Sequence, residues 1–385
     1  MMRKSLLALS LAVAFIPVTA YPNTTINGFA SIKAGMTTGS DERLYGYDDT
    51  LDFKNESLIA LQVKSDLGDK LSVTAQLLGR GRDDFDVGFE WAFISYELSD
   101  NMTINAGRLR TPFYKYSDFK DVGYAYDWLR VPQGVYGLGF DTIEGLTFYR
   151  TAQIGSVDST LQLIFGGYDG NASLSGAQVS AQIDNVTGIT WELAKDAFSA
   201  RFAYLTGKTS IDTSPVTLAP GFTVGNLYQA LAANGLTPLV TAIDIDDESS
   251  NFIGVGLTYD DSDWIAVAEY TRVEVENSFI ATQKNWYVSL GKRFDGITPY
   301  ISYERENNDA VVSIYQPYTG VLPPQLLVPV QGLVASQERD ASTWNLGVRY
   351  DFHPSAAFKA QYSSEDSDTT GQRNGVLAFG IDLVF

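Results

Sequence analysis

Residues 374–385 read Asn-Gly-Val-Leu-Ala-Phe-Gly-Ile-Asp-Leu-Val-Phe and decide the fold class. Large apolar side chains occupy every second position, namely Leu377, Phe379, Ile381, Leu383 and Phe385. Small or polar residues stand between them, namely Ala378, Gly380 and Asp382. A period of two predicts a β-strand whose two faces meet different surroundings. Because the apolar face is regular and ends on an aromatic ring, the stretch is typical of a strand that faces lipid.

The same alternation recurs upstream, for example in residues 344–352, 286–290 and 71–77. In each case the second face is polar or small, as the lumen of a water-filled barrel requires. The pattern predicts about sixteen strands. Their expected ranges are 26–35, 56–65, 70–82, 87–98, 102–110, 141–153, 158–168, 178–194, 198–208, 251–260, 264–275, 284–294, 297–306, 341–352, 356–365 and 374–385.

The connections between these strands alternate between short turns and long segments near 36–53, 111–140, 210–250 and 307–340. Short turns at one end and long loops at the other are typical of an outer-membrane barrel. In lipid, only a closed sheet satisfies every backbone N–H and C=O group. We therefore expect an all-β, transmembrane antiparallel β-barrel with an aqueous channel. A two-layer sandwich would show a similar alternation and remains an alternative fold.

Residues 1–20 resemble a secretory signal peptide, with basic Arg3 and Lys4, an apolar core and small residues before a cleavage point at Ala20. Residues 21–385 would then form the barrel as a single domain. The formal net charge of −19 argues against nucleic acid as a partner. Export without a spanning helix predicts the outer membrane of a Gram-negative bacterium as the location.

Over the whole mature chain, the sequence resembles the sixteen-stranded porins of Gram-negative bacteria. The resemblance rests on the strand rhythm, the 374–385 terminus, and the strand Asn101–Arg108 that precedes the long segment 111–140. The segment from Arg110 to Phe119 is similar to that of a less characterised porin-like group. The resemblance implies that the third loop folds into the lumen and forms the constriction. It also implies a homotrimer, lipid and lipopolysaccharide contacts, and a terminal strand read by the barrel-assembly machinery.

Charged residues near this loop are candidates for the pore constriction, where opposite charges across a narrow opening create a transverse field. The candidates for the basic wall are Arg80, Arg82, Arg108 and Arg110. The candidates for the acidic side are Asp118, Asp121 and Asp127. Arg80 and Arg82 share the polar face of the third strand. Arg108 shares its face with apolar residues, so it reaches the lumen only through a bulge or if that face is not the lipid face. The alternative for both Arg108 and Arg110 is that they bind lipid phosphate at the membrane surface.

Other features of the loops leave alternatives open. The aromatic residues of segment 111–140 either stack on sugars or wedge the loop against the wall; they are Tyr114, Tyr116, Tyr124, Tyr126, Trp128 and Tyr136. The acidic residues between Asp244 and Glu248 are either a solvated cluster or a Ca²⁺ site. Residues 226–233 predict a short helix, and the apolar stretch 321–334 is expected to pack over the mouth or against a neighbour.

The sequence predicts a channel for passive diffusion of small hydrophilic solutes and ions. A substrate-selective channel for an oligosaccharide or an anion is the first alternative, and a structural or adhesive barrel is the second. We expect no enzyme, since the single histidine, His353, lies in a predicted turn without a catalytic partner pattern. Neither a cofactor motif nor a metal-ligand set is found in the sequence.

Overall fold

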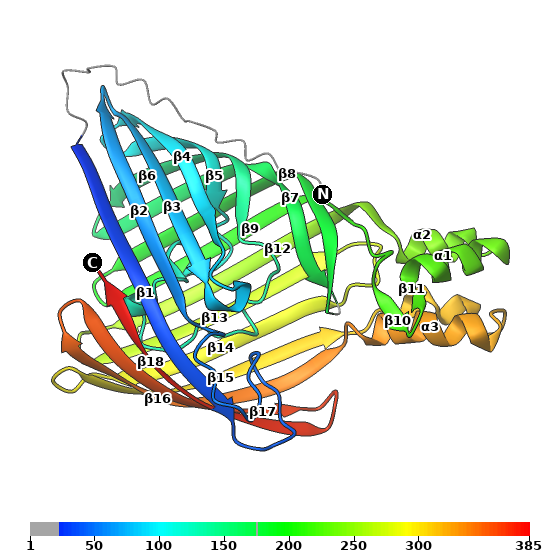
Figure 1. Ribbon diagram of the computed structural model, residues 1–385. Helices are drawn as coiled ribbons and strands as arrows, with labels where there is room; N and C mark the ends of the chain where they lie inside the picture. The colour runs from blue at the N-terminus through cyan, green and yellow to red at the C-terminus, as the bar shows by residue number, and fades with distance from the viewer. Residues whose placement is uncertain (1–22, 175) are drawn as a thin grey trace, which may run out of the picture.

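A closed antiparallel barrel forms the body of the protein in the computed structural model, which describes residues 23–174 and 176–385. The predicted signal peptide, residues 1–20, lies outside the described residues. Neighbouring strands pair in chain order, and β1 pairs with β18 to close the sheet (Figure 1). The barrel strands are β1 (Asn23–Thr37), β2 (Leu58–Gly68), β3 (Leu71–Arg80), β4 (Val87–Ser99), β5 (Met102–Arg110), β6 (Thr142–Ile154), β7 (Val157–Leu174), β8 (Ala177–Lys195), β9 (Phe198–Ile211), β12 (Ile245–Asp260), β13 (Trp264–Val275), β14 (Thr282–Lys292), β15 (Ile297–Asp309), β16 (Arg339–His353), β17 (Ala356–Ser367) and β18 (Gln372–Val384).

The barrel has sixteen strands, which confirms the predicted architecture. Most observed strands match the predicted ranges within a few residues. The main difference lies at the long-loop end, where β7, β8, β9 and β12 form a tall wall. For example, β12 begins at Ile245, although the alternation predicts a start at 251. Beyond the membrane both faces of a strand meet water or loops, so the alternation that reports a lipid face disappears there.

The predicted lipid face points away from the barrel axis. Leu377 and Phe379 of β18 are exposed, whereas Ala378 and Asp382, on the other face of the strand, are buried inside. On the outer surface, Trp286, Tyr303 and Trp344 of adjacent strands form a row of rings, with Tyr303 4.8 Å from Trp344 between ring centroids. Exposed apolar side chains on a folded protein need a nonpolar solvent, and here that solvent is lipid.

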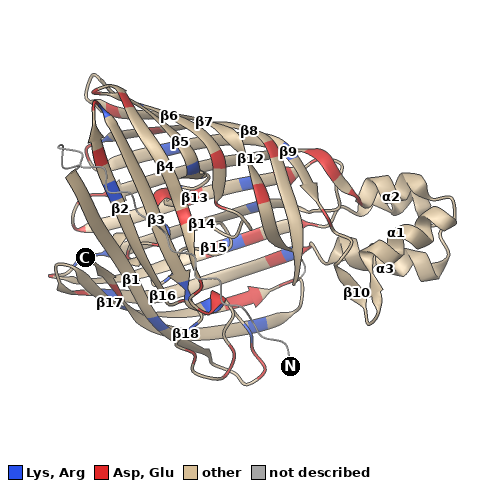
Figure 2. Ribbon diagram, turned by 45° about the horizontal axis from the view of Figure 1, so that its top comes forward, with Lys and Arg blue, Asp and Glu red and all other residues tan. Residues whose placement is uncertain are grey.

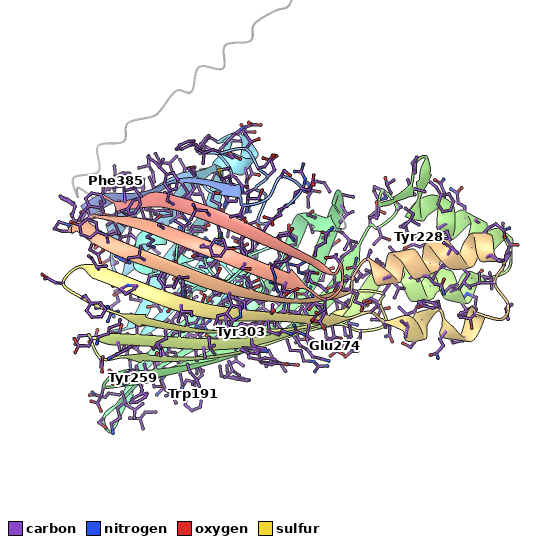
Figure 3. All side chains as sticks on the ribbon, turned by 90° about the horizontal axis from the view of Figure 1, so that it is seen from below. Trp191, Tyr228, Tyr259, Glu274, Tyr303 and Phe385 are labelled. Carbon is purple, nitrogen blue, oxygen red and sulfur yellow. The ribbon has the colours of Figure 1, made fainter. Side chains whose placement is uncertain are left out.

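Outside the barrel strands lie the first external loop (residues 38–57), a long loop after β5 and a helical lobe. Residues 111–141, which we call the third loop, contain the short 3₁₀ turns η2 (Ser117–Phe119) and η3 (Gly123–Ala125). At the long-loop end, α1 (Val224–Ala233), α2 (Thr237–Ile243), α3 (Pro324–Ala335) and the small hairpin β10 (Thr217–Ala219)–β11 (Phe222–Thr223) form a helical lobe. The lobe carries Tyr228 and lies at the opposite end of the barrel from Phe385 (Figure 3). Among the described residues, no helix has the length and apolar character needed to cross a membrane.

The outer face of β16 offers a test of the inside–outside assignment. Leu346 lies midway along the strand and is 62% exposed. Leu346→Arg is expected to lower the free energy of unfolding by about 2–4 kcal/mol, because the charge meets hydrocarbon near the midplane. Leu346→Tyr, which stays compatible with lipid, is the control. Urea unfolding in lipid vesicles measures both, and equal stability of the two variants would contradict the assignment.

Candidate pore constriction

The third loop enters the barrel and crosses the lumen from β5 to the opposite wall. The indole N–H of Trp128 donates to Ser289 Oγ on β14 over 2.8 Å. The backbone N–H of Leu129 lies 3.1 Å from Tyr300 Oη on β15. Because the loop begins beside β5 and reaches β14 and β15, it obstructs much of the barrel's cross-section.

Three basic side chains on the far wall bind the backbone of the loop. Lys359 Nζ of β17 is fully buried and donates to the carbonyl oxygens of residues 123, 126 and 128 at 2.5, 2.6 and 2.8 Å. Lys33 Nζ of β1 donates to the carbonyl of Leu129 at 2.6 Å. Arg349 of β16 donates to the carbonyl of Tyr124 at 2.8 Å. We call Lys33, Arg349 and Lys359 the carbonyl clamp. It satisfies acceptors that are otherwise buried away from solvent, and charge strengthens each bond.

Acidic side chains hold both the entering and the returning half of the loop. Glu269 of β13 accepts hydrogen bonds from the backbone N–H of Lys115 and the hydroxyl of Tyr136, both at 2.7 Å. Glu56, in the first external loop, pairs with Arg130 at 2.6 Å. The loop is therefore bound by cations at its carbonyls and by anions at its donors, which fixes it inside the barrel.

The loop's aromatic rings act as a wedge. Five of the six predicted rings are buried, and Tyr124 is partly exposed. The ring centroids of Tyr116 and Trp128 lie 5.3 Å apart, and those of Trp128 and Tyr287 of β14 lie 5.5 Å apart, both edge-on. Rings that pack against each other and against the wall cannot offer their faces to a sugar, so the structure favours the wedge.

A buried ion-pair network closes the base of the loop. Arg110 lies among three carboxylates, with nitrogen–oxygen distances of 2.9 Å to Glu90 and 2.7 Å to Asp121 and Asp141. Arg80 of β3 pairs with Glu90 at 3.1 Å and with Asp121 at 3.2 Å. Burial by itself would raise the pKa of Asp121, but Arg110 and Arg80 outweigh burial and hold that pKa below its ordinary value. Asp121 is therefore ionised as an anchor of the loop.

The three carboxylates of this network are spaced closely enough to bind a metal ion, but their surroundings do not suit one. Among the described residues, Glu90, Asp121 and Asp141 form a group whose oxygens lie within 4.8 Å of one another. However, the guanidinium of Arg110 already binds all three. It supplies the positive charge that a cation would otherwise supply, so these residues do not fit a metal ion.

The structure brings some predicted site residues together and separates others. Arg80, Arg110 and Asp121 share the network, and Asp127 faces Arg349 of the clamp at 3.8 Å. Asp118 is exposed, and its electrostatic partner is Arg201 of β9. Arg82 lies in the turn η1 (Gly81–Asp83), beyond the end of β3, so its placement on the strand was wrong.

The prediction for Arg108 is also wrong, because its side chain lies on the outer face. Arg108 stands opposite Glu144 across the β5–β6 pair, 3.7 Å from it. Two residues along this pair, Ala106 stands opposite Leu146, which is exposed on the outer surface. The parity of the strand therefore directs Arg108 outward, and the bulge that would turn it inward does not interrupt this register.

Two cavities flank the third loop. The first, of about 250 Å³, adjoins β1, β3 and the first external loop. We call it the basic cavity, since its charged lining residues are Lys33, Glu56, Arg80, Arg82, Lys120, Asp121 and Arg130. The second, of about 380 Å³, has a lining of mixed charge, which includes Asp127, Asp260, Arg293, Arg349 and Asp351. Small polar solutes fit such spaces.

Sequence reasoning missed most of the residues that hold the loop. The missed anchors are Lys33, Glu56, Glu90, Glu269, Arg349 and Lys359. A usable signal was present for those inside strands: a charged residue in the middle of a membrane strand, on its polar face, needs a partner in the lumen. Lys359, between Phe358 and Ala360, is the clearest example.

Comparison with known proteins identifies the family. A model described as Gram-negative porin matches residues 7–373. The chain belongs to the Gram-negative porin family. This porin is an outer-membrane channel for passive diffusion. A search of curated protein sequences found no match.

Solved structures show the same fold at low sequence identity. A loop-deletion mutant of OmpT, an outer membrane protein of Vibrio cholerae, has a TM-score of 0.59 and 13% identity, covering 94% of this porin and 99% of that chain. An anion-selective porin from Comamonas acidovorans has a TM-score of 0.58 and 12% identity, covering 95% and 100%. OmpF of Salmonella typhi, in complex with daunomycin, has a TM-score of 0.58 and 16% identity, covering 94% and 97%.

The carbonyl clamp predicts how the loop limits current. Lys359→Met removes three donors to the loop backbone and leaves those carbonyls without their partner. We expect the loop to loosen, with a larger and noisier single-channel conductance. Lys195→Met, at an exposed position next to a turn, is the control and should conduct as the unmodified porin does. Because Lys359→Met also leaves Asp382 without its partner, Arg349→Met serves as a second variant. Unchanged conductance in both would show that the clamp does not hold the constriction.

Proposed function

We propose that this porin is a narrow general-diffusion channel with a preference for small anions. The observation that carries the proposal is the lining of the basic cavity, which has five basic and two acidic residues. This local excess of positive charge stands against a formal net charge of −19 for the whole chain. Selectivity depends on the charges at the narrowest water rather than on net charge, since the low-dielectric wall focuses their field.

Arg82 is the best residue with which to test this preference. Its side chain is 64% exposed and lies 3.6 Å from Asp83, whereas Arg80 is part of the buried network. Arg82→Ala should shift the reversal potential under a KCl gradient toward cations, more at 0.1 M than at 1 M salt, where the screening length falls to about 3 Å. Arg43→Ala, in the first external loop, is the matched control. A reversal potential that already reports cation preference in the unmodified porin would contradict the proposal.

Acidic residues test the same field with the opposite sign. Asp118→Asn, on the exposed surface of the third loop, should shift the reversal potential toward anions. Asp247→Asn, among the acidic residues at the outer start of β12, should shift it much less. Among the described residues, the acidic side chains of 244–248 do not converge into a group that could hold a metal ion. We therefore interpret them as a solvated cluster. An equal shift from Asp247→Asn would move the selective region out of the third loop.

Assembly adds two further proposals. We infer a homotrimer, because one similar structure, at 12% identity, is the trimer form of OmpT of Vibrio cholerae. The outward ion pair Arg108–Glu144 supports a surface that is covered by protein or by lipopolysaccharide headgroups, since hydrocarbon would not solvate it. We also infer that the barrel-assembly machinery reads the terminal strand.

The last residue tests that inference. Phe385 is exposed, and its backbone exchanges two hydrogen bonds with Gly28, at 2.7 and 2.9 Å, where the sheet closes. Deleting Phe385 should reduce the amount of folded porin in the outer membrane severalfold. Phe385→Ala keeps the backbone bonds and should reproduce most of the loss if the ring is the signal. A normal amount of Phe385→Ala porin, measured by the heat-modifiable band on gels, would assign the defect to closure instead.

A further inference from the structure

The helical lobe is free of charge. Residues 213–243 and 310–337, which form its helices and hairpin, contain no Asp, Glu, Lys or Arg, although 19% of the chain is charged. Figure 2 shows the contrast, since the lobe is tan while the barrel carries acidic and basic residues. A surface loop facing only water has no reason to avoid charge over two separate segments. The composition points to a function that charge would disturb.

The lobe has its own hydrophobic core, which continues into the barrel mouth. Leu227 and Leu231 of α1 pack in one buried cluster with Val330 and Leu333 of α3. Val179 of β8 belongs to the same cluster. Partly buried side chains at the outer strand ends pack against it, namely Leu174, Ile211, Val275 and Ile280. The lobe therefore stands on the rim of the barrel with an apolar base.

Between this base and the third loop lies a cavity of about 500 Å³, which we call the vestibule. Leu174, Val179 and Ile280 line its outer part. Its floor is aromatic: the ring centroids of Phe113 and Phe140 lie 5.3 Å apart, and Phe113 lies 4.8 Å from Phe252. The vestibule thus connects the apolar base of the lobe to the aromatic cluster of the constriction.

The barrel wall below the vestibule is apolar as well. Inward-facing residues of β7, β8, β9, β12 and β13 include Ile164, Ile183, Val186, Leu205, Phe252 and Val267, all buried. The opposite wall, on β15 to β17, has buried polar residues, including Ser302, Asn345, Gln361 and Ser363. The polar or small lumen face that the alternation predicts is therefore interrupted here by large apolar side chains. The β7 to β13 side of the inner wall thus carries an apolar patch, interrupted by polar residues such as Gln162, Thr190 and Glu269, whereas the β15 to β17 side is polar.

We propose that the vestibule binds uncharged amphipathic solutes that carry an aromatic or short hydrocarbon body and a hydrogen-bonding end. Its volume and its largely apolar lining with a few polar groups match those of small-molecule sites. Gln283 and Asn308 lie in the lining and supply donors and acceptors for the polar end. The charged members of the lining are Glu338 and Arg339, and the guanidinium of Arg339 is paired with Glu306 and Glu365. This inference rests on the proposed channel function and names a solute class that such a site would concentrate above the constriction.

Current through the complete porin in a planar bilayer tests the proposal. The probe is 4-methylumbelliferyl β-glucoside, and methyl β-glucoside, which has the same sugar without the rings, is the control. We expect the aryl glucoside to interrupt the current reversibly, with an effect that saturates, and the methyl glucoside to leave it unchanged at equal concentration. Equal interruption by both, or none by the aryl glucoside, overturns the proposal. An absence of any ion current from folded porin would instead contradict the channel function.

Variants locate the site. Ile280→Asn replaces an apolar wall by a polar one. Ala172→Leu fills space beside the third loop, where the Cβ of Ala172 lies 3.5 Å from the position of a Cβ at Gly139. Each variant should raise the half-blocking concentration of the aryl glucoside about tenfold. Val321→Asn, exposed in the lobe and outside the vestibule lining, should leave it unchanged. If the half-blocking concentration of the aryl glucoside is the same for both vestibule variants as for the unmodified porin, the ring binds elsewhere and the proposal fails.

Discussion

The need of a buried backbone for hydrogen-bond partners governs the interior of this porin. A loop of irregular structure inside a barrel carries carbonyl and N–H groups that no ladder satisfies. The carbonyl clamp supplies cations for the carbonyls, and Glu269 supplies an acceptor for the N–H of Lys115. Without these charged groups, the backbone of the third loop would form more hydrogen bonds in bulk water than inside the lumen. The constriction therefore exists because strands on the far side of the barrel carry charge at membrane depth.

The sequence predicted the barrel far better than the site, and the reason is physical. Lipid and lumen impose a period of two on each strand independently, so the pattern in residues 374–385 is legible without knowledge of any other strand. The constriction depends on pairs distant in sequence, such as Lys359 with the carbonyl of Gly123. No local pattern encodes such a pair.

Individual residues show where local reasoning ended. Arg80 and Asp121 were identified as charged residues of the constriction, but their direct pairing was not foreseen. Arg108 was misplaced, although its parity with Ala106 already indicated the outer face. The apolar patch on the inner face of β7 to β13 was missed because single residues of several strands form it, such as Ile164, Leu205 and Phe252, and no one strand's alternation reveals it. The aromatic rings of the third loop pack against these apolar residues, so each surface buries the other away from water.

The charge-free lobe also has a consequence for where the porin can work. Ion pairs weaken as salt rises, and titratable groups lose their partners as pH changes. Neither the helices of the lobe nor its hairpin contain an acidic or basic side chain, and their shared core is apolar. Added salt strengthens apolar burial when the ions are excluded from the protein surface, as sulfate is. The part of the porin that projects beyond the barrel is thus held together by contacts that depend little on acidity or salinity.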